Sequence, residues 1–267
     1  MATPEAVSKD FVQSLARGLQ ILQAVAQDDG IHTLSSVASR TNLSRGTASR
    51  LLGTLNQLGY VGKHGREYRL TSQVLELGYG YLSSLGIPAI STEHIRVLAD
   101  DVGEAASVTV REGREMIYVA RANPVRVMTV SLGVGARLPL WNTSMGRVHL
   151  SALADEDVRP LLEASAPLTP HTPLTLVDPD SILDRVRQVR EQGWCLVDQE
   201  LEWGLRSIAV PLRQRDRIVA ALNVATAQVG ESPEETISRL LPSLHHTQQK
   251  IQWALDKLPD QGFPLPE

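Results

Sequence analysis

Three short helical patterns follow one another within the first sixty residues, and their spacing constrains the fold more than any other feature of the chain. Apolar residues recur every three or four positions after Ser14, after Thr33 and after Ser44, and each of these hydroxyl residues is suited to cap a helix. Residues 41–43 break the second pattern, and Gly59 is placed to end the third. The sequence therefore predicts two helices that meet at a tight turn, as in a helix-turn-helix.

The third predicted helix, residues 45–58, has an apolar face and an opposite face of small residues and hydrogen-bond donors. Small side chains let a backbone approach a surface closely, and serine, threonine and arginine reach phosphates and base edges in a major groove. Residues 60–70 follow as a predicted hairpin with a basic, glycine-rich tip. We interpret the segment as a winged helix-turn-helix that binds double-stranded operator DNA. A small helical bundle used for protein contacts is the alternative.

The distribution of charge supports the DNA-binding interpretation. The formal net charge of −4 would disfavour nucleic acid if it were spread evenly over the chain. Residues 33–69, however, carry a net charge of +5, whereas residues 73–267 sum to −7. A cationic module attracts phosphates locally while the rest of the chain stays anionic. The residues expected to contact DNA are Thr33, Arg40, Ser44, Arg45, Thr47, Ser49, Arg50, Lys63 and Arg66.

Composition limits the remaining possibilities. A length of 267 residues favours two domains, and 42% hydrophobic residues are enough to build their cores. The sequence has no apolar stretch long enough to span a membrane and no signal-peptide pattern, so we expect a cytoplasmic protein. The single cysteine, Cys195, cannot form an intramolecular disulfide or a cysteine-rich metal site.

A further amphipathic helix is predicted at Gln73–Leu85, capped by Ser72 and ended by Gly86-Ile87-Pro88. Its apolar stripe is expected to form a dimer contact, because helix-turn-helix proteins usually bind paired half-sites. The predicted domains are a flexible N-terminus at residues 1–10, the winged helix-turn-helix at 11–72, a linker helix at 73–88, an effector-binding domain at 89–260 and a C-terminal tail at 261–267.

Helical and strand patterns alternate after the linker, and their order predicts an α+β domain. The expected helices are 92–102, 144–153, 155–163 and 181–192, and the expected strands are 105–111, 115–122, 127–132, 194–198, 205–212 and 218–225. Ser232-Pro233-Glu234-Glu235 is a capping box that opens a last helix, which Pro242 is expected to kink or divide. Trp194 and Trp203 are expected in the core or in a pocket wall.

Residues 142–146 raise the question of catalysis. Asn142-Thr143-Ser144-Met145-Gly146 resembles a nucleophile elbow, and Asp198 and His245 would complete the order serine, acid, histidine. The first glycine of that motif is missing, and the strand pattern lacks the parallel βαβ alternation of such hydrolases. We expect instead that a helix starting at Ser144 binds a carboxylate at its N-terminus. A serine hydrolase or other enzyme fused to a DNA-binding module is the alternative.

We expect no cofactor and no metal. Residues 133–138 contain only two of the three glycines of a dinucleotide fingerprint, and Pro139 follows in place of a helix. The histidines are scattered, and the adjacent pair His245 and His246 has no cluster of cysteine or acidic residues beside it.

Three segments together resemble the IclR family of bacterial transcription regulators, and the resemblance covers almost the whole chain. They are Arg17-Gly18-Leu19-Gln20-Ile21-Leu22, then Gly135-Ala136-Arg137-Leu138-Pro139 with Thr143-Ser144-Met145-Gly146-Arg147, and then Asp198-Gln199-Glu200 with Gly204-Leu205-Arg206-Ser207-Ile208-Ala209-Val210-Pro211. Val127-Met128-Thr129-Val130 is most similar to regulators of aromatic-acid breakdown through protocatechuate and β-ketoadipate, whereas Trp141-Asn142 differs from their pattern.

The resemblance implies a transcription repressor or activator with no enzymatic activity. It further implies a sensor domain similar to GAF domains, homodimers that pair into tetramers, and a pocket for a small carboxylate or aromatic-acid effector between the sheet and the loop before Ser144. The pocket residues that it implies are Leu138, Trp141, Ser144, Met145, Asp198, Leu205, Ser207, Asn223 and Ala225.

Overall fold

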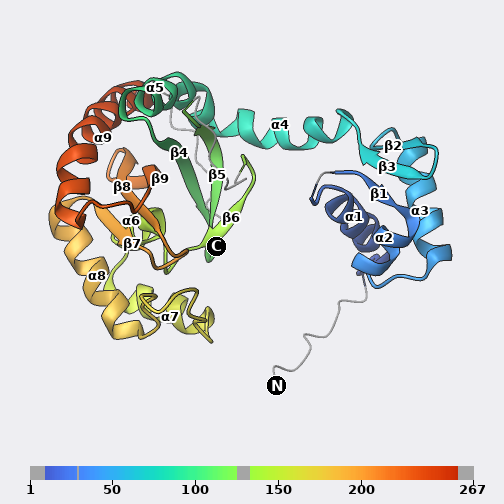
Figure 1. Cartoon of the computed structure of the whole chain (residues 1–267), viewed down its shortest axis with the longest axis horizontal. Coiled ribbons are helices and arrows are strands. Elements are labelled where there is room, and N and C mark those ends of the chain that lie inside the picture. Colours follow the sequence, from blue (N-terminus) through green and yellow to red (C-terminus); the bar gives the residue numbers. More distant parts are fainter. Residues whose placement is uncertain (1–9, 29, 125–132, 258–267) are drawn as a thin grey trace. The chain divides into compact units, whose positions relative to one another are not determined.

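The computed structural model describes residues 10–28, 30–124 and 133–257 (Figure 1). The chain divides into two compact units, residues 1–81 and residues 82–267, and each unit has its own hydrophobic core. None of the helices in the described ranges is long and apolar enough to cross a membrane.

The N-terminal unit combines three helices with a small antiparallel sheet. Its elements are α1 (Gln13–Val25), β1 (His32–Thr33), α2 (Leu34–Arg40), α3 (Arg45–Gln57), β2 (Val61–His64) and β3 (Glu67–Leu70), with the strand order β1-β3-β2. Ile21, Val37, Leu52 and Val61 come from four of these elements and are buried together. Gly65 closes the β2–β3 hairpin with a φ of 60°, which glycine adopts without strain. The predicted helix-turn-helix and wing are therefore present.

Two of the three helix caps predicted for α1, α2 and α3 are confirmed. The side chains of Thr33 and Ser44 each accept a hydrogen bond from the backbone N–H three residues later, at 3.3 and 3.2 Å. The predicted cap at Ser14 is wrong, because α1 begins at Gln13 and already contains Ser14. The residue that precedes α1 is Val12, whose side chain has no acceptor.

Helix α4 (Gln73–Leu85) agrees with the predicted linker, but α5 (Ile87–Val102) begins well before Thr92, where a helix was expected to start. Gly86 lies between the two helices with a φ of 65°. Pro88 occupies the first turn of α5, where its missing N–H leaves no helical hydrogen bond unmade. The proline that was expected to mark a domain boundary therefore begins a helix.

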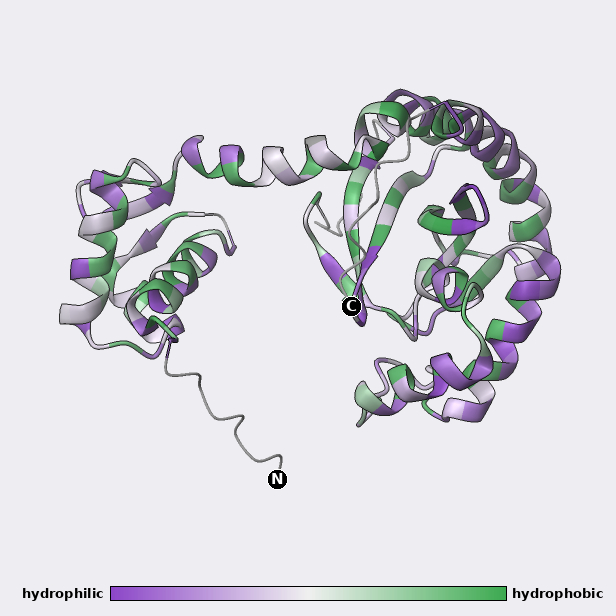
Figure 2. Cartoon of the chain, turned by 180° about the vertical axis from the view of Figure 1, so that it is seen from behind, coloured by the Kyte–Doolittle hydropathy of each residue, from purple (hydrophilic) through white to green (hydrophobic). Residues whose placement is uncertain are grey.

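The C-terminal unit is built on one antiparallel sheet in the order β6-β5-β4-β9-β8-β7. Its strands are β4 (Ala105–Glu112), β5 (Glu115–Ala122), β6 (Arg137–Pro139), β7 (Cys195–Asp198), β8 (Leu205–Gln214) and β9 (Arg217–Ala227). Helices α5 and α9 (Pro233–Leu255) cover one face, and α6 (Ser144–Leu150), α7 (Asp155–Ala164) and α8 (Pro179–Gln192) pack on the other. Figure 2 shows hydrophobic residues along the strands and hydrophilic residues on the outer helices, as expected for a sheet that is buried on both faces.

Several details of the C-terminal unit differ from expectation. The strand expected at 127–132 lies outside the described residues, and the short strand β6 was not predicted. Helix α9 runs through Pro242 without division, because Leu240 and Leu244 on either side are fully buried and their packing outweighs the lost hydrogen bond. Trp203 is 66% exposed, so its predicted place in the core or a pocket wall is wrong.

Candidate functional site

The outer face of α3 presents the side chains that the sequence predicted for DNA contact. Ser44, Arg45, Ser49 and Arg50 are exposed, whereas Thr47 is half-buried and shares a hydrogen bond of 3.0 Å with the Ser44 hydroxyl. The opposite face of α3 is fixed in the core of the unit. No ion pair among the described residues engages either arginine, so both guanidinium groups can donate to phosphates or base edges.

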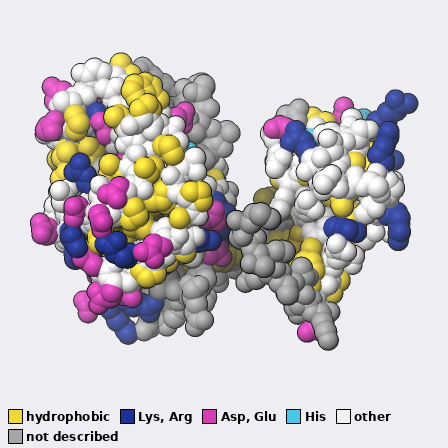
Figure 3. Space-filling model, turned by 90° about the horizontal axis from the view of Figure 1, so that it is seen from below, with side chains coloured by type: hydrophobic (Ala, Val, Ile, Leu, Met, Phe, Trp, Pro, Cys, Tyr) yellow, Lys and Arg dark blue, Asp and Glu magenta, His cyan; other side chains and the backbone are white. Residues whose placement is uncertain are grey.

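The wing supplies two further cations beside α3 in the same unit. Lys63 and Arg66 are exposed, and the Lys63 ammonium lies 5.6 Å from the centre of the Tyr68 ring, a cation–π contact that leaves its N–H groups accessible. Arg40 behaves differently because it forms an ion pair with Asp28. Figure 3 shows Lys and Arg side chains projecting from this unit with few acidic groups beside them.

Large apolar side chains remain exposed on α1 and α4. Leu15 and Leu19 of α1 are 64% and 50% exposed, and Leu75 and Tyr79 of α4 are 72% and 73% exposed. Exposed apolar groups gathered on a helix are typical of surfaces that another chain covers.

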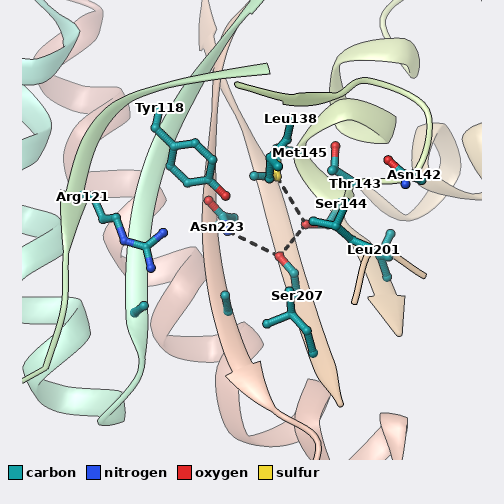
Figure 4. A pocket seen from close by; sticks show the side chains of 14 residues that line it. Tyr118, Arg121, Leu138, Asn142, Thr143, Ser144, Met145, Leu201, Ser207 and Asn223 are labelled. Atoms are coloured by element: carbon teal, nitrogen blue, oxygen red, sulfur yellow. Dashed lines mark hydrogen bonds between the residues drawn. The ribbon is translucent and has the colours of Figure 1, made fainter. Parts of the chain in front are cut away.

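A cavity lies in the C-terminal unit, between the sheet and the loop that leads into α6 (Figure 4). Its empty space, including the open mouth, is about 590 Å³, of which the centre of a water-sized sphere can reach about 40 Å³. A single water needs roughly 10–15 Å³ of such space, so the cavity holds more than one water. Seven of the nine predicted pocket residues line it, namely Leu138, Ser144, Met145, Leu205, Ser207, Asn223 and Ala225.

Strand alternation explains why β8 and β9 contribute two residues each. Leu205 and Ser207 are two positions apart, as are Asn223 and Ala225, so each pair points to the same face of the sheet. Ser207 lies opposite Ala225 in the β8–β9 register, which brings the two pairs together.

Three polar side chains meet in the middle of the cavity. The hydroxyls of Ser144 and Ser207 share a hydrogen bond of 2.7 Å, and the Asn223 amide donates to the Ser207 hydroxyl at 3.3 Å (Figure 4). Ser144 and Asn223 are almost completely buried. Beyond each other and the Met145 sulfur, which lies 3.9 Å from the Ser144 hydroxyl, these groups can exchange hydrogen bonds only with whatever occupies the cavity.

A β-bulge directs a cation into the same cavity. Tyr118 and Arg121 are three residues apart on β5 and would face opposite sides of a regular strand. The register of β4 and β5 shifts by one residue, so that Tyr118 lies opposite Thr109 and Arg121 lies opposite Ser107. Because Ser107 and Thr109 share one face of β4, the two β5 side chains share it as well. Arg121 therefore enters the cavity instead of the core under α5 and α9.

Tyr118 and Arg121 form one wall of the cavity. The guanidinium carbon lies 5.7 Å from the centre of the phenol ring, and the Arg121 Nε donates to the Asn123 side chain at 3.1 Å. Burial raises the pKa of Tyr118 to about 12, with the charge of Arg121 opposing that shift, so the phenol is neutral at physiological pH.

The loop before α6 contributes an amide with no partner. Asn142 is completely buried and lines the cavity, yet neither its Nδ2 nor its Oδ1 has a hydrogen-bond partner. The Oδ1 of Asn223 is likewise unpaired. Buried polar groups left unpaired cost stability, so they point to a ligand or water that the cavity is built to receive.

A buried ion pair holds this loop in place. Both terminal nitrogens of Arg147 donate to the Glu200 carboxylate at 2.6 Å, and its Nε donates to the Trp141 carbonyl at 3.1 Å. Gly146 packs so closely beneath the loop that an added Cβ would lie 1.8 Å from the Leu140 carbonyl oxygen. The loop and α6 thus form one rigid part of the cavity.

The structure places two predicted pocket residues outside the cavity. Trp141 packs into the core under α6 and α8, with its ring 6.4 Å from that of His171. Asp198 pairs with Arg206 at 2.9 Å, because the alternation of β7 and the β7–β8 register direct it toward that guanidinium.

The same arrangement rules out the triad that the sequence order suggested. Asp198 is bound to Arg206, and His245 shares a hydrogen bond with Gln248 on α9, the helix that covers the other face of the sheet from Ser144. Ser144 has another serine, not a histidine, as its partner. Within the described ranges, no group of three histidine, cysteine or acidic side chains is placed to hold a metal ion.

Comparison with protein families identifies both units. Residues 79–253 match the family described as bacterial transcriptional regulator IclR C-terminal, and residues 14–65 match the IclR helix-turn-helix domain. The chain belongs to the IclR family. It is therefore a DNA-binding transcription regulator and not an enzyme, as the motif resemblance implied.

Individual relatives extend the similarity to the regulators that the sequence resembled. The Pca regulon regulatory protein of Pseudomonas putida is 43% identical over 237 residues, 88% of this chain and 81% of that protein. A crystal structure of a transcriptional regulator from Rhodococcus sp. RHA1 is 42% identical, with a TM-score of 0.81 over 92% of this chain and 98% of the other. A double mutant of the inducer-binding domain of PobR from Acinetobacter, solved with 3-hydroxybenzoic acid, is 29% identical, with a TM-score of 0.58 over 62% of this chain and 97% of that chain.

Sequence reasoning missed three polar groups of the cavity wall. Tyr118 and Arg121 lie on a strand whose bulge no periodicity announces, and Asn142 belongs to the dipeptide that departed from the family pattern. That departure was the available signal for Asn142, because it fell directly beside the predicted pocket.

Proposed function

We propose that this IclR-family regulator acts in the cytoplasm on operator DNA and controls genes of aromatic-acid breakdown in response to an aromatic acid bound in the cavity. The observation that carries the proposal is the pairing of an exposed cationic α3 with a cavity of unpaired buried polar groups in one chain. The similarity to a Pca regulon regulator and to a PobR double mutant that was solved with 3-hydroxybenzoic acid supports the choice of ligand class.

In this proposal α3 enters the major groove and the wing contacts the backbone. Arg45 and Arg50 donate to bases or phosphates, and the predicted partners Ser44, Thr47 and Ser49 lie along the same face. Lys63 and Arg66 contact phosphates, and Thr33 before α2 and Arg40 at its end are further proposed DNA contacts. The contacts to phosphates carry no sequence information, and the affinity that they contribute falls as the salt concentration rises.

The regulator binds DNA as a homodimer, or as a dimer of dimers. The exposed apolar groups of α1 and α4, among them Leu19, Leu75 and Tyr79, support this assignment, because a second copy would cover them. Two copies would also provide the paired reading helices that helix-turn-helix proteins use on symmetric sites.

Effector binding is coupled to DNA binding through α4, which joins the two units in the chain. An acid that fills the cavity between the sheet and α6 alters the spacing or the rigidity of the paired reading helices and so changes operator affinity.

A gel-shift titration on the DNA upstream of the protein's own gene tests the DNA-binding part. We expect saturable binding that weakens steeply with salt, and Arg50→Ala should weaken it by about 1–3 kcal/mol if Arg50 reads a base. Arg185→Ala removes another exposed cation, on α8, and serves as the matched control, with no expected change. Equal losses for the two variants would contradict the assignment of α3.

A further inference from the structure

The polar groups of the cavity are distributed unevenly, and their placement restricts the effector beyond its general class. Arg121 and Asn142 stand at opposite ends of the cavity in Figure 4, with the Ser144, Ser207 and Asn223 cluster between them. The ends differ in chemistry, because one presents a cation and the other a neutral amide. A ligand that satisfies both must have a charged end and a neutral polar end.

Building on the proposed function, we propose that the cavity selects an aromatic monocarboxylate with ring hydroxyls. Its carboxylate binds Arg121, the hydroxyl opposite the carboxylate binds the unpaired amide of Asn142, and any further hydroxyl binds that of Asn223. Three cross-strand neighbours set the distance between Arg121 and Asn223. Arg121 lies opposite Ser107, and Ser107 lies opposite Asn223, so the two ends of this row are two strands apart. Neighbouring strands are about 4.8 Å apart, so the backbones of Arg121 and Asn223 are separated by roughly 10 Å.

The lining between the two ends of the cavity suits a benzene ring. Ala105 and Ala225 lie opposite each other in the β4–β9 register and both line the cavity. Their short side chains leave room for the ring above the sheet. Leu138 and Met145 enclose the space from the side of β6 and α6. A flat apolar body with polar groups at its two ends matches this surface.

The carboxylate belongs at the Arg121 end, and not at the N-terminus of α6 where the sequence predicted it, because the Thr143 hydroxyl already accepts from the Gly146 N–H there. The Nε of Arg121 is occupied by Asn123, while its two terminal nitrogens have no hydrogen-bond partner within the described residues. Those terminal nitrogens present the paired donors that suit a carboxylate. The cation–π contact with Tyr118 restrains the guanidinium in the free protein, which reduces the ordering cost of binding.

The hydroxyl belongs at the Asn142 end. An amide can both accept from a phenol and donate to it, whereas no cation among the described lining residues other than Arg121 could neutralise a second carboxylate there. Burying an uncompensated charge is far more costly than burying a hydroxyl that finds a partner. A monocarboxylate with a phenol is therefore favoured over a dicarboxylate.

Calorimetric titration of the full-length protein tests this orientation with four probes: 4-hydroxybenzoate, its neutral analogue 4-hydroxybenzamide, benzoate, and the dianion terephthalate. The wild type should prefer 4-hydroxybenzoate to each of the others. Arg121→Met should weaken binding of 4-hydroxybenzoate roughly 10- to 100-fold, the value of a charge-assisted hydrogen bond, and change the amide by less than about threefold. Arg114→Met, on the tip of the β4–β5 hairpin outside the cavity, is the matched control and should behave as the wild type.

Asn142→Leu separates a binding role from a structural one. Because its amide is unpaired in the free protein, the variant should melt no lower than the wild type, yet it should bind 4-hydroxybenzoate and benzoate with nearly equal affinity. Equal losses for the acid and the amide in Arg121→Met, or a retained hydroxyl preference in Asn142→Leu, would overturn the orientation while leaving an aromatic-acid regulator intact. Failure of all four probes to bind the wild type would instead overturn the proposed ligand class and this inference with it.

Discussion

Removing one member of the buried Arg147–Glu200 pair should destabilise the C-terminal unit strongly. The two side chains are only 1% and 9% exposed, and both guanidinium nitrogens lie 2.6 Å from the carboxylate. Arg147→Met would leave the Glu200 carboxylate buried, with the Leu176 backbone N–H as its remaining donor among the described contacts. Breaking such a pair costs about 3–5 kcal/mol. In a unit of this size that corresponds to a fall in Tm of about 6–20 °C.

A double-mutant cycle followed by urea denaturation measures this pair directly. Glu200→Gln removes the charge but retains an acceptor for the Leu176 N–H, and it should also be strongly destabilising. The double variant leaves no unpaired charge, so its loss should be smaller than the sum of the single losses by about 2 kcal/mol or more. Losses that simply add, or single losses below about 1 kcal/mol, would refute the reasoning.

Three further predictions follow from individual residues. Gly146→Ala should destabilise the C-terminal unit by about 1–3 kcal/mol or more, because its Cβ would collide with the Leu140 carbonyl. Gly53→Ala, where the added Cβ meets open space on α3, should stabilise the N-terminal unit by about 0.5–1 kcal/mol, and thermal unfolding compares the two variants. Burial, with the charge of Arg111, lowers the pKa of His149 from 6.5 to about 3, so the free energy of unfolding falls as the pH drops from 6.5 towards 3. His149→Gln should reduce the slope of that free energy against pH by about 1.4 kcal/mol per pH unit, measured by urea denaturation, and an unchanged slope would contradict the assignment. Burial raises the pKa of Cys195 to about 12, so a thiol reagent at pH 8 should label only unfolded protein, and rapid labelling of the native form would exclude the buried site.

Much of the fold could be predicted from local patterns. The caps at Thr33 and Ser44, the glycine of the wing turn and the capping box at Ser232 are short-range signals, and the structure contains each of them. Errors arose where long-range packing outweighs local preference. Pro242 stays inside α9 because buried leucines flank it, which the sequence pattern alone could not weigh.

The candidate site was predictable only in part, for a geometric reason. The family resemblance implied Ser207 and Asn223, and they line the cavity because β8 and β9 alternate regularly there. Arg121 reaches the cavity only because a bulge reverses the direction of its side chain. Asp198 was expected at the pocket, but it forms an ion pair with Arg206. Contacts between distant segments decide both cases.

The most direct test of the account is the coupling between the cavity and DNA. Fluorescence anisotropy of a labelled operator fragment, titrated with the full-length protein with and without saturating 4-hydroxybenzoate, measures it in one experiment. We expect the acid to change the Kd for the wild type by at least about fivefold and to leave Arg121→Met unchanged at the same concentration, although both bind the fragment equally without acid. A wild-type Kd that stays the same with the cavity saturated would contradict an effector-controlled regulator.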